Sequence, residues 1–351
     1  MSGPAGGTRP DAQDGAAEPP PGDPDLPPDA DSHQDTAHWD TAHRDADQPV
    51  VAGCRRCAGP VLPGDRYCER CGMRLDAAAR SGTRPLRASD ARQRDLGLAA
   101  GATDRGLVHR ANEDGMGLAL LPDGQGAVGV VCDGVSSAPG SGPAAAGAAR
   151  AATELLTLRA EQWRPGPGLA EEVTTALRDA ARAAQAAAVA GAAELGLTPA
   201  CTFVAAVTVG DTLVVGWLGD SRAYLVDDAG TRRLTEDDTL AAEAVRAGQL
   251  PPELAEQGRA AHTITRWLGS ACPSPVPRTR IVRLRPPGRV VLCSDGLWNY
   301  ASAAAALAAH IAEPGAGATP IAVARHLVDV ALRAGGADNV TVIVIDIPGS
   351  A

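Results

Sequence analysis

Acidic residues stand at the ends of the strongest apolar runs in this chain, and they restrict its possible folds more than any other feature. The run AVGVVC is followed by Asp133, VVLCS by Asp295 and LVVGWLG by Asp220, while Asp338 and an asparagine precede VTVIVI. Moving a lone carboxylate out of water costs on the order of several kcal/mol unless its charge is compensated. No arginine adjoins Asp133, Asp295 or Asp338. We therefore expect the fold to gather these acids around shared divalent cations.

The types of ligand predict which cations these are. Glu113 and Asp114 precede another apolar run, GMGLALL, and every candidate ligand is an oxygen. Oxygen ligands favour hard ions such as Mg²⁺ or Mn²⁺ over zinc. Gly134 and Gly296 each follow a candidate aspartate, where the missing Cβ lets the backbone turn tightly and a carbonyl approach the metal. Two such ions about 4 Å apart can bind a phosphate group and generate a hydroxide nucleophile.

The pattern of apolar runs between residues 97 and 347 predicts the fold class. The strand candidates are rich in β-branched residues and include GMGLALL, AVGVVC, FVAAVTV, TLVVGWLG, AYLV, VVLC and VTVIVIDI. Two Ala-rich segments, 143–163 and 168–195, have helical spacing and are joined by RPGPG, which indicates an antiparallel helix pair. Because the strands lack a regular alternation with helices, the pattern favours an α+β domain with mainly antiparallel sheets.

The first 96 residues differ in composition and predict three further segments. Residues 1–48 are rich in Pro, Asp and Gly, which predicts a disordered acidic tail. Residues 49–76 contain two C-x-x-C pairs separated by ten residues, a spacing typical of a zinc ribbon with one structural Zn²⁺. An Arg-rich linker is expected at 77–96. The expected zinc ligands are Cys54, Cys57, Cys68 and Cys71.

Composition excludes several classes of function. All 32 basic residues are arginine, so the chain has no P-loop lysine and no Schiff-base lysine. Residues 1–50 carry ten Asp and one Glu against two Arg, and so hold nine of the ten net negative charges. The nearly neutral remainder gives no argument for binding nucleic acid. With no run of 18 apolar residues, no secretion signal and no disulfide pattern, we expect a cytoplasmic protein that does not span a membrane.

The order of the acidic motifs is the most specific signal in the sequence. RANED, VVCDG, GWLGDSRAYLV, LTEDDTL, TITRWLG, CSDGLWN and GGADNVTVIVI follow one another between residues 97 and 347. In this order they resemble the motifs of the bacterial metal-dependent (type 2C, PPM) serine/threonine protein phosphatases. The resemblance implies an αββα sandwich, in which two antiparallel β-sheets are flanked by antiparallel helix pairs. It also implies hydrolysis of phosphoserine and phosphothreonine by a water that bridges two Mn²⁺ or Mg²⁺ ions.

The matched motifs also imply roles for individual residues. Asp133 would bridge both ions, and the carbonyl of Gly134 would help to hold one of them. Asp220, in GDSR, matches a position that helps to hold a third, weaker ion in bacterial members. Asp295 and Asp338 would complete the catalytic binuclear core with Asp133. Ligands acting directly or through water would be Glu113 and Asp114.

This sequence departs from the family pattern at three places. The family commonly has an arginine four residues before the Glu of its NED motif, where it grips the substrate phosphate; here that position is His109, and Arg110 follows it. We expect either residue to bind phosphate. Residues 135–137 read VSS and supply no general acid. Asn299 replaces an aspartate associated with the third metal, which predicts poor occupancy of that site.

Two alternatives to an active phosphatase remain open. One is a catalytically weak or inactive relative that acts as a sensor of phosphoproteins. The other is an adaptor whose zinc ribbon binds a protein partner. As substrates or ligands, the resemblance implies phosphorylated proteins, including Ser/Thr kinases and their targets.

A further motif points to a different class of phosphatase. Residues 272–279 read CPSPVPRT, which matches the C-x5-R-T signature of cysteine-dependent phosphatases. Such a loop binds phosphate through backbone N–H groups, and three prolines remove three of those donors. We therefore interpret this match as coincidental.

Overall fold

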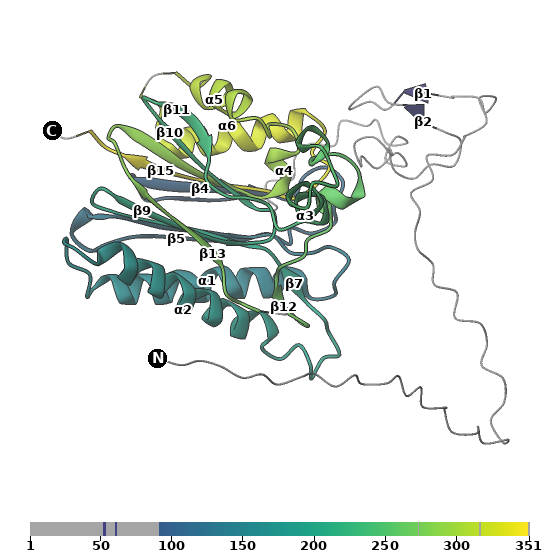
Figure 1. The fold of residues 1–351 in the computed structure, drawn as a ribbon, viewed down its shortest axis with the longest axis horizontal. Coiled ribbons are helices and arrows are strands. Elements are labelled where there is room, and N and C mark those ends of the chain that lie inside the picture. The colour runs from purple at the N-terminus through teal and green to yellow at the C-terminus, as the bar shows by residue number, and fades with distance from the viewer. Residues whose placement is uncertain (1–51, 54–59, 62–90, 273, 316, 350–351) are drawn as a thin grey trace, which may run out of the picture. The chain divides into compact units, whose positions relative to one another are not determined.

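The computed structural model describes residues 52–53, 60–61, 91–272, 274–315 and 317–349 (Figure 1). The predicted acidic tail, the four cysteines of the predicted zinc ribbon and most of the predicted linker lie outside the described residues. Within the ribbon segment, the short strands β1 (Ala52–Gly53) and β2 (Pro60–Val61) form an antiparallel pair. No helix in the described part of the chain combines the length and the hydropathy that a membrane span needs.

Two antiparallel sheets form the centre of the domain. The five-stranded sheet consists, in spatial order, of β13 (Arg278–Arg283), β9 (Thr212–Leu218), β8 (Phe203–Val209), β6 (Gly126–Cys132) and β5 (Gly115–Leu120). The six-stranded sheet consists of β11 (Gly230–Arg233), β10 (Arg222–Asp227), β14 (Gly288–Cys293), β15 (Val340–Ile347), β4 (Ala99–Asp104) and β3 (Arg92–Asp95). A separate small pair joins β7 (Ala200–Cys201) and β12 (Leu268–Gly269).

Helices cover the outer face of each sheet (Figure 1). On the five-stranded sheet lie α1 (Ser141–Ala160) and α2 (Leu169–Val189), and on the six-stranded sheet lie α5 (Ala304–Ala312) and α6 (Pro320–Arg333). Two shorter helices, α3 (Leu240–Arg246) and α4 (Asp295–Trp298), lie in the connections. Short 3₁₀ turns occur at Pro122–Gly124, Pro252–Leu254 and Arg259–His262.

Three layers of apolar side chains hold these elements together. One lies between the two sheets and includes Leu292 and Ile343 from one sheet and Val215 from the other. The others lie beneath each helix pair. The layer beneath α1 and α2 is rich in alanine, so the two helices lie close to the sheet and pack on it without large side chains. At Gly117 a Cβ atom would stand 2.1 Å from Thr153 Oγ1, so glycine in β5 lets α1 lie directly on the sheet.

The structure confirms the predicted α+β class, with two antiparallel sheets flanked by helix pairs. The expected helices 143–163 and 168–195 correspond to α1 and α2, which end at residues 160 and 189. Strand β3 (Arg92–Asp95) precedes residue 97, the expected start of the domain, and pairs with β4 in the six-stranded sheet. This strand is an exposed edge strand of charged and polar residues, so it lacks the apolar alternation that identifies strands in sequence.

Candidate metal centre

The strand pairing brings acids from both sheets to one end of the sandwich. In the five-stranded sheet, Gly115 of β5 pairs with Cys132 of β6, so Asp114 and Asp133 lie beside each other. In the six-stranded sheet the ladder continues past β14, where Ser294 N donates to Thr341 O at 3.1 Å. Asp295, which opens α4, therefore lies close to the residues that precede β15. The separate runs of the sequence converge because antiparallel neighbours begin and end at the same edge.

Several carboxyl groups at this end of the sandwich have raised pKa values, because they are buried close to one another. Burial raises the pKa of Asp133 well above its ordinary value, and repulsion from Asp114, Asp295, Asp338 and Asp220 raises it further. Burial followed by repulsion from Asp295 raises the pKa of Asp338 to about 8. The pKa of Asp220 is raised by burial first and then by Asp295. Five carboxylates that repel one another in this way form a site for cations.

Asp114 gives a direct test of whether a cation fits. Its Oδ2 accepts hydrogen bonds from Ser294 Oγ at 3.0 Å and from Thr341 Oγ1 at 2.7 Å. Its Oδ1 is buried and has no hydrogen-bond partner among the described residues. Burial raises the pKa of Asp114 to about 6, although the two hydroxyl groups act in the opposite direction. One oxygen is thus held in place while the other is left for a ligand, and a hard cation fits an all-oxygen site.

The glycines that follow Asp133 and Asp295 let neighbouring backbone segments approach closely. A Cβ atom on Gly134 would stand 2.5 Å from the carbonyl oxygen of Glu113, and one on Gly296 would stand 1.9 Å from that of Asn339. Both positions therefore require glycine for steric reasons. The backbones of Glu113 and Gly134 are neighbours, so both sequence-predicted residues lie beside Asp133.

Asn339 fixes the loop that carries Glu113, a role that the sequence did not reveal. Its Oδ1 accepts from Glu113 N at 2.7 Å, while its Nδ2 donates to the carbonyls of Arg105 at 2.7 Å and Ala111 at 3.0 Å. Asn339 is almost fully buried. Its amide thus satisfies three backbone groups of a loop far away in sequence. The only sequence signal was its position beside Asp338.

The two candidate phosphate-binding residues lie differently. His109 Nε2 is 3.2 Å from Asp338 Oδ1, and the side chain is 26% exposed, so the imidazole lies at the accessible rim of the acidic cluster. Arg110 is exposed, and among the described residues its side chain forms no ion pair with the carboxylates. The structure therefore brings His109 to the site, whereas Arg110 is exposed and has no ion pair with a carboxylate in the described part of the chain.

His262 joins the site although sequence reasoning missed it. Its Nδ1 lies 3.7 Å from Asp295 Oδ2, and its ring stacks on Trp298 with the centroids 5.6 Å apart. Donor atoms of Asp220, His262 and Asp295 all lie within 4.8 Å of one another. Asn299 Nδ2 donates to Asp295 Oδ2 at 3.2 Å instead of offering a second carboxylate. The signal in the sequence was the position of His262 directly before the TITRWLG motif.

A buried arginine supports the floor of the site. Arg222 is fully buried, and its Nη2 contacts Asp237 at 2.6 Å and Glu256 at 2.7 Å. Its guanidinium also lies 3.8 Å from the centre of the Trp298 ring. The Trp298 indole in turn donates to the carbonyl of Asp220 at 2.9 Å. Arg222 therefore supports the acidic cluster by packing on Trp298, and its charge partly offsets the rise in the pKa of Asp220.

The cysteine-phosphatase motif has a different role in the fold. Arg278 begins β13, and its Nε donates to the buried Asp238 at 2.7 Å. An arginine engaged in this way is not available to bind phosphate beside Cys272. The structure thus agrees with the interpretation of CPSPVPRT as a coincidental match.

Comparisons with known proteins place this geometry among phosphatases. A family model described as Protein phosphatase 2C matches residues 108–327. The chain is 33% identical over 261 residues to serine/threonine protein phosphatase PstP of Mycobacterium tuberculosis, a match that covers 71% of this chain and 44% of that protein. It is also 33% identical over 201 residues to serine/threonine phosphatase stp of Listeria monocytogenes, covering 56% of this chain and 76% of that protein. The chain thus spans less than half the length of the mycobacterial relative.

Solved structures show the same likeness. The catalytic domain of PstP in complex with two manganese ions superposes with a TM-score of 0.55 at 28% identity, covering 74% of this chain and 100% of that one. Serine/threonine phosphatase Stp1 from Staphylococcus aureus superposes with a TM-score of 0.60 at 25% identity, covering 73% and 96%. Both matches exceed the length of the region that the family model recognises.

Proposed function

The chain belongs to the protein phosphatase 2C family, and from this premise we propose that it is a metal-dependent phosphatase that hydrolyses phosphoserine and phosphothreonine in proteins. The observation that carries the proposal is the convergence of five aspartates at one end of the sandwich, where burial and mutual repulsion raise the pKa values of Asp133 and Asp338. Mutual repulsion of this kind destabilises a fold unless cations are bound. The two manganese ions in complex with the PstP catalytic domain support the same choice of metal.

The ligand set fits two Mn²⁺ or Mg²⁺ ions. We assign Asp133 as the ligand shared by both ions, because every other aspartate of the cluster acts on its pKa. When bound, the two ions would supply positive charge for the phosphate and lower the pKa of a water molecule. The other ligands in this proposal are the side chains of Asp295, Asp338, Asp114 and Glu113 and the carbonyl of Gly134.

The chain itself supplies groups that bind and orient the substrate. Arg110 is an exposed cation directly after His109 in the chain, and we assign it to recognition of the phosphate. His109 contacts Asp338 and is accessible, so it is placed to hold a proton for the departing serine or threonine oxygen. This role matters because residues 135–137 carry no acid. Loss of the alkaline limb of the pH–rate profile in His109→Gln, with KM unchanged, would support the assignment, because a proton donor is inactive once it is deprotonated.

The third ion is proposed to be weak. Asn299 gives an amide where the family often has an aspartate, and its Nδ2 donates to Asp295. The third ligand beside Asp220 and Asp295 is then the imidazole of His262 and not a further carboxylate. A mixed nitrogen and oxygen set holds Mg²⁺ less well than oxygen alone, so occupancy should be low and should favour Mn²⁺.

We also propose roles for the cysteine-rich segment before residue 91. Cys54, Cys57, Cys68 and Cys71 are assigned to one structural Zn²⁺, because two C-x-x-C pairs supply a complete tetrahedral set. We assign the ribbon to binding a protein partner, since Tyr67 is its single aromatic residue and base stacking needs more. Phosphorylated Ser/Thr kinases or their targets are the proposed substrates, acting in the cytoplasm.

The experiment that tests the activity is hydrolysis of a phosphothreonine peptide by the full chain. Activity should require Mn²⁺ or Mg²⁺ and should fall by several orders of magnitude in Asp133→Asn and Asp295→Asn. Asp329→Asn, on the exposed face of α6, is the matched control and should leave the rate unchanged. A folded wild-type protein that binds the metals but shows no hydrolysis would favour the alternative, a phosphoprotein sensor.

A further inference from the structure

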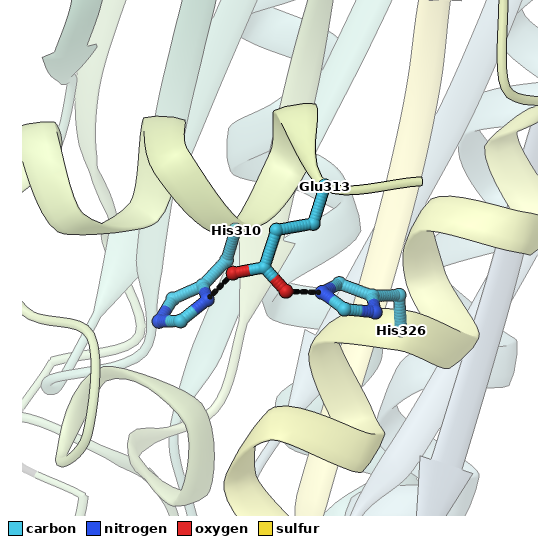
Figure 2. Close-up of side chains that lie close together, drawn as sticks. All are labelled: His310, Glu313 and His326. Atoms are coloured by element: carbon cyan, nitrogen blue, oxygen red, sulfur yellow. Dashed lines mark hydrogen bonds and ion pairs between the residues drawn. The ribbon is translucent and has the colours of Figure 1, made fainter. Parts of the chain in front are cut away.

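A second group of metal-binding side chains lies on the outer helix pair, away from the carboxylates. Figure 2 shows His310, near the end of α5, and His326, within α6, on either side of the Glu313 carboxylate. His310 Nδ1 lies 2.8 Å from Glu313 Oε1, and His326 Nε2 lies 2.9 Å from Oε2. One ligand atom from each residue lies within 4.8 Å of the other two.

The donor atoms suit one borderline cation. Around a tetrahedral Zn²⁺ with bonds of about 2.0–2.2 Å, neighbouring donors stand roughly 3.4 Å apart. The observed separations, from 2.8 Å up to no more than 4.8 Å, lie on both sides of this value. Small rotations of the three side chains would therefore complete the geometry. Two imidazoles and one carboxylate are a frequent protein ligand set for Zn²⁺, with water in the fourth position.

A simpler account is that Glu313 only forms hydrogen bonds to the two histidines and so fastens α5 to α6. The contact with His310 agrees with this account. The contact with His326 does not, because Nε2 is shielded from solvent yet lacks hydrogen-bond geometry toward Glu313, and it has no other hydrogen-bond partner among the described residues. A buried ring nitrogen whose one close contact, with Glu313 Oε2 at 2.9 Å, is poorly aligned for a hydrogen bond would be better satisfied by coordination to a cation.

The site is also charged and open in the way that metal binding needs. The Glu313 carboxylate lies between two imidazoles, so the site offers one acidic oxygen ligand and two nitrogen ligands. The side chains of Glu313 and His310 are 49% and 29% exposed, which gives an ion access from solvent. Nitrogen ligands also favour Zn²⁺ over Mg²⁺, so this site and the all-oxygen site would take different ions.

We propose that His310, Glu313 and His326 form a zinc site that joins α5 to α6 on the outside of the six-stranded sheet. Both helices bury their apolar faces in the layer that also contains Trp298 of α4. An ion at this position would link the end of α5 to the middle of α6 and so stabilise the helix pair. The proposal is independent of the phosphatase activity, because no residue of the carboxylate cluster takes part.

The test compares zinc binding by the full chain and by a double variant, His310→Gln and His326→Gln. Glutamine keeps a hydrogen-bond donor toward Glu313 but is a poor zinc ligand, so a hydrogen-bonded contact would survive while the metal site would not. Zn²⁺ is added to chelator-treated protein in saturating Mg²⁺, and bound zinc is measured by equilibrium dialysis. Zinc held by the cysteines or by the histidines of the first 48 residues is then common to both proteins.

We expect the wild-type chain to bind one more Zn²⁺ than the double variant. A hundredfold excess of zinc over its Kd should raise the wild-type melting temperature by about 5 °C or more beyond the rise in the variant. Glu313→Gln provides a second variant that removes the charged ligand at a half-exposed position. Asp329→Asn, one turn from His326, should behave as wild type. Equal zinc content and equal shifts in all four proteins would overturn the proposal and leave only a hydrogen-bonded contact.

Discussion

Removing the divalent ions should make the stability of this protein depend on pH, with the ion-free protein becoming more stable as the pH falls. Burial and repulsion raise the pKa of Asp114 to about 6 and that of Asp338 to about 8, whereas an aspartate in an unfolded chain titrates near 3.9. Between these values the ion-free folded state binds protons that the unfolded state does not. The free energy of unfolding should therefore rise as the pH falls from 8.5 to 5.5.

The magnitude follows from the same shifts. Asp114 is almost completely buried, and its shift of about two pKa units corresponds to about 3 kcal/mol if titrated fully. About 1 kcal/mol of this falls between pH 8.5 and 5.5. Asp338 acts in the same direction at higher pH, but its side chain is 37% exposed, so solvent screening reduces its effect. From Asp114 and Asp338 alone we expect a gain of roughly 2 kcal/mol over this range, and the raised pKa values of Asp133 and Asp220 act in the same direction.

The assay is urea unfolding followed by tryptophan fluorescence, in EDTA and in saturating Mg²⁺. Bound ions need ionised carboxylates, so protons compete with Mg²⁺ and its stabilising effect should shrink as the pH falls. The slope should thus be negative in EDTA and close to zero in saturating Mg²⁺. Asp114→Asn should flatten the slope in EDTA, while Asp329→Asn should not change it. A stability in EDTA that rises with pH, or an equal effect of Mg²⁺ at pH 8.5 and 5.5, would refute the reasoning.

Three further substitutions test the supports of the site. Arg222→Leu leaves Asp237 without its buried arginine partner and should lower the free energy of unfolding, measured in urea, by about 3–5 kcal/mol. Arg283→Leu removes one side of an exposed ion pair and should lower it by less than about 1 kcal/mol. Asn339→Ala removes three hydrogen bonds and should cost about 2–4 kcal/mol, with weaker Mg²⁺ binding by calorimetry; unchanged stability would contradict its positioning role. Calorimetry with Mn²⁺ should give two tight sites in wild type and in His262→Ala, with the weak third binding lost in the variant. Three tight sites in the wild type would contradict a weak third ion.

The sequence predicted the acids of the site because each one interrupts a strong local pattern. Asp133 and Asp295 stand out since a buried apolar strand should not end in an uncompensated charge. The supporting residues carry no such signal. Thr341 looks like an ordinary β-branched strand residue, and only its place opposite Ser294 turns its hydroxyl toward Asp114. His262 reaches Asp295 across 33 residues of chain, a distance that no local pattern encodes.

Strands whose residues have low β-propensity likewise depend on tertiary contacts that the local sequence does not reveal. Strand β4 has the sequence AAGATD, in which alanine and glycine give little reason to expect a strand. It forms because β15 pairs with it over six residues and because its glycine permits contact between the sheets: a Cβ atom on Gly101 would stand 2.3 Å from Met116 Sδ. The neighbouring edge strand β3 is held by the same pairing.

The sequence by itself determined the fold class, the two long helices and the identity of the acidic residues. These depend on the periodicity of apolar residues and on the cost of burying charge, which act over short stretches of chain. Only the tertiary structure decided which acids meet, which hydroxyl and amide groups hold them, and that His310, Glu313 and His326 converge on α5 and α6. These arrangements depend on strand order and helix packing, which bring distant residues together through contacts that are summed over the whole domain.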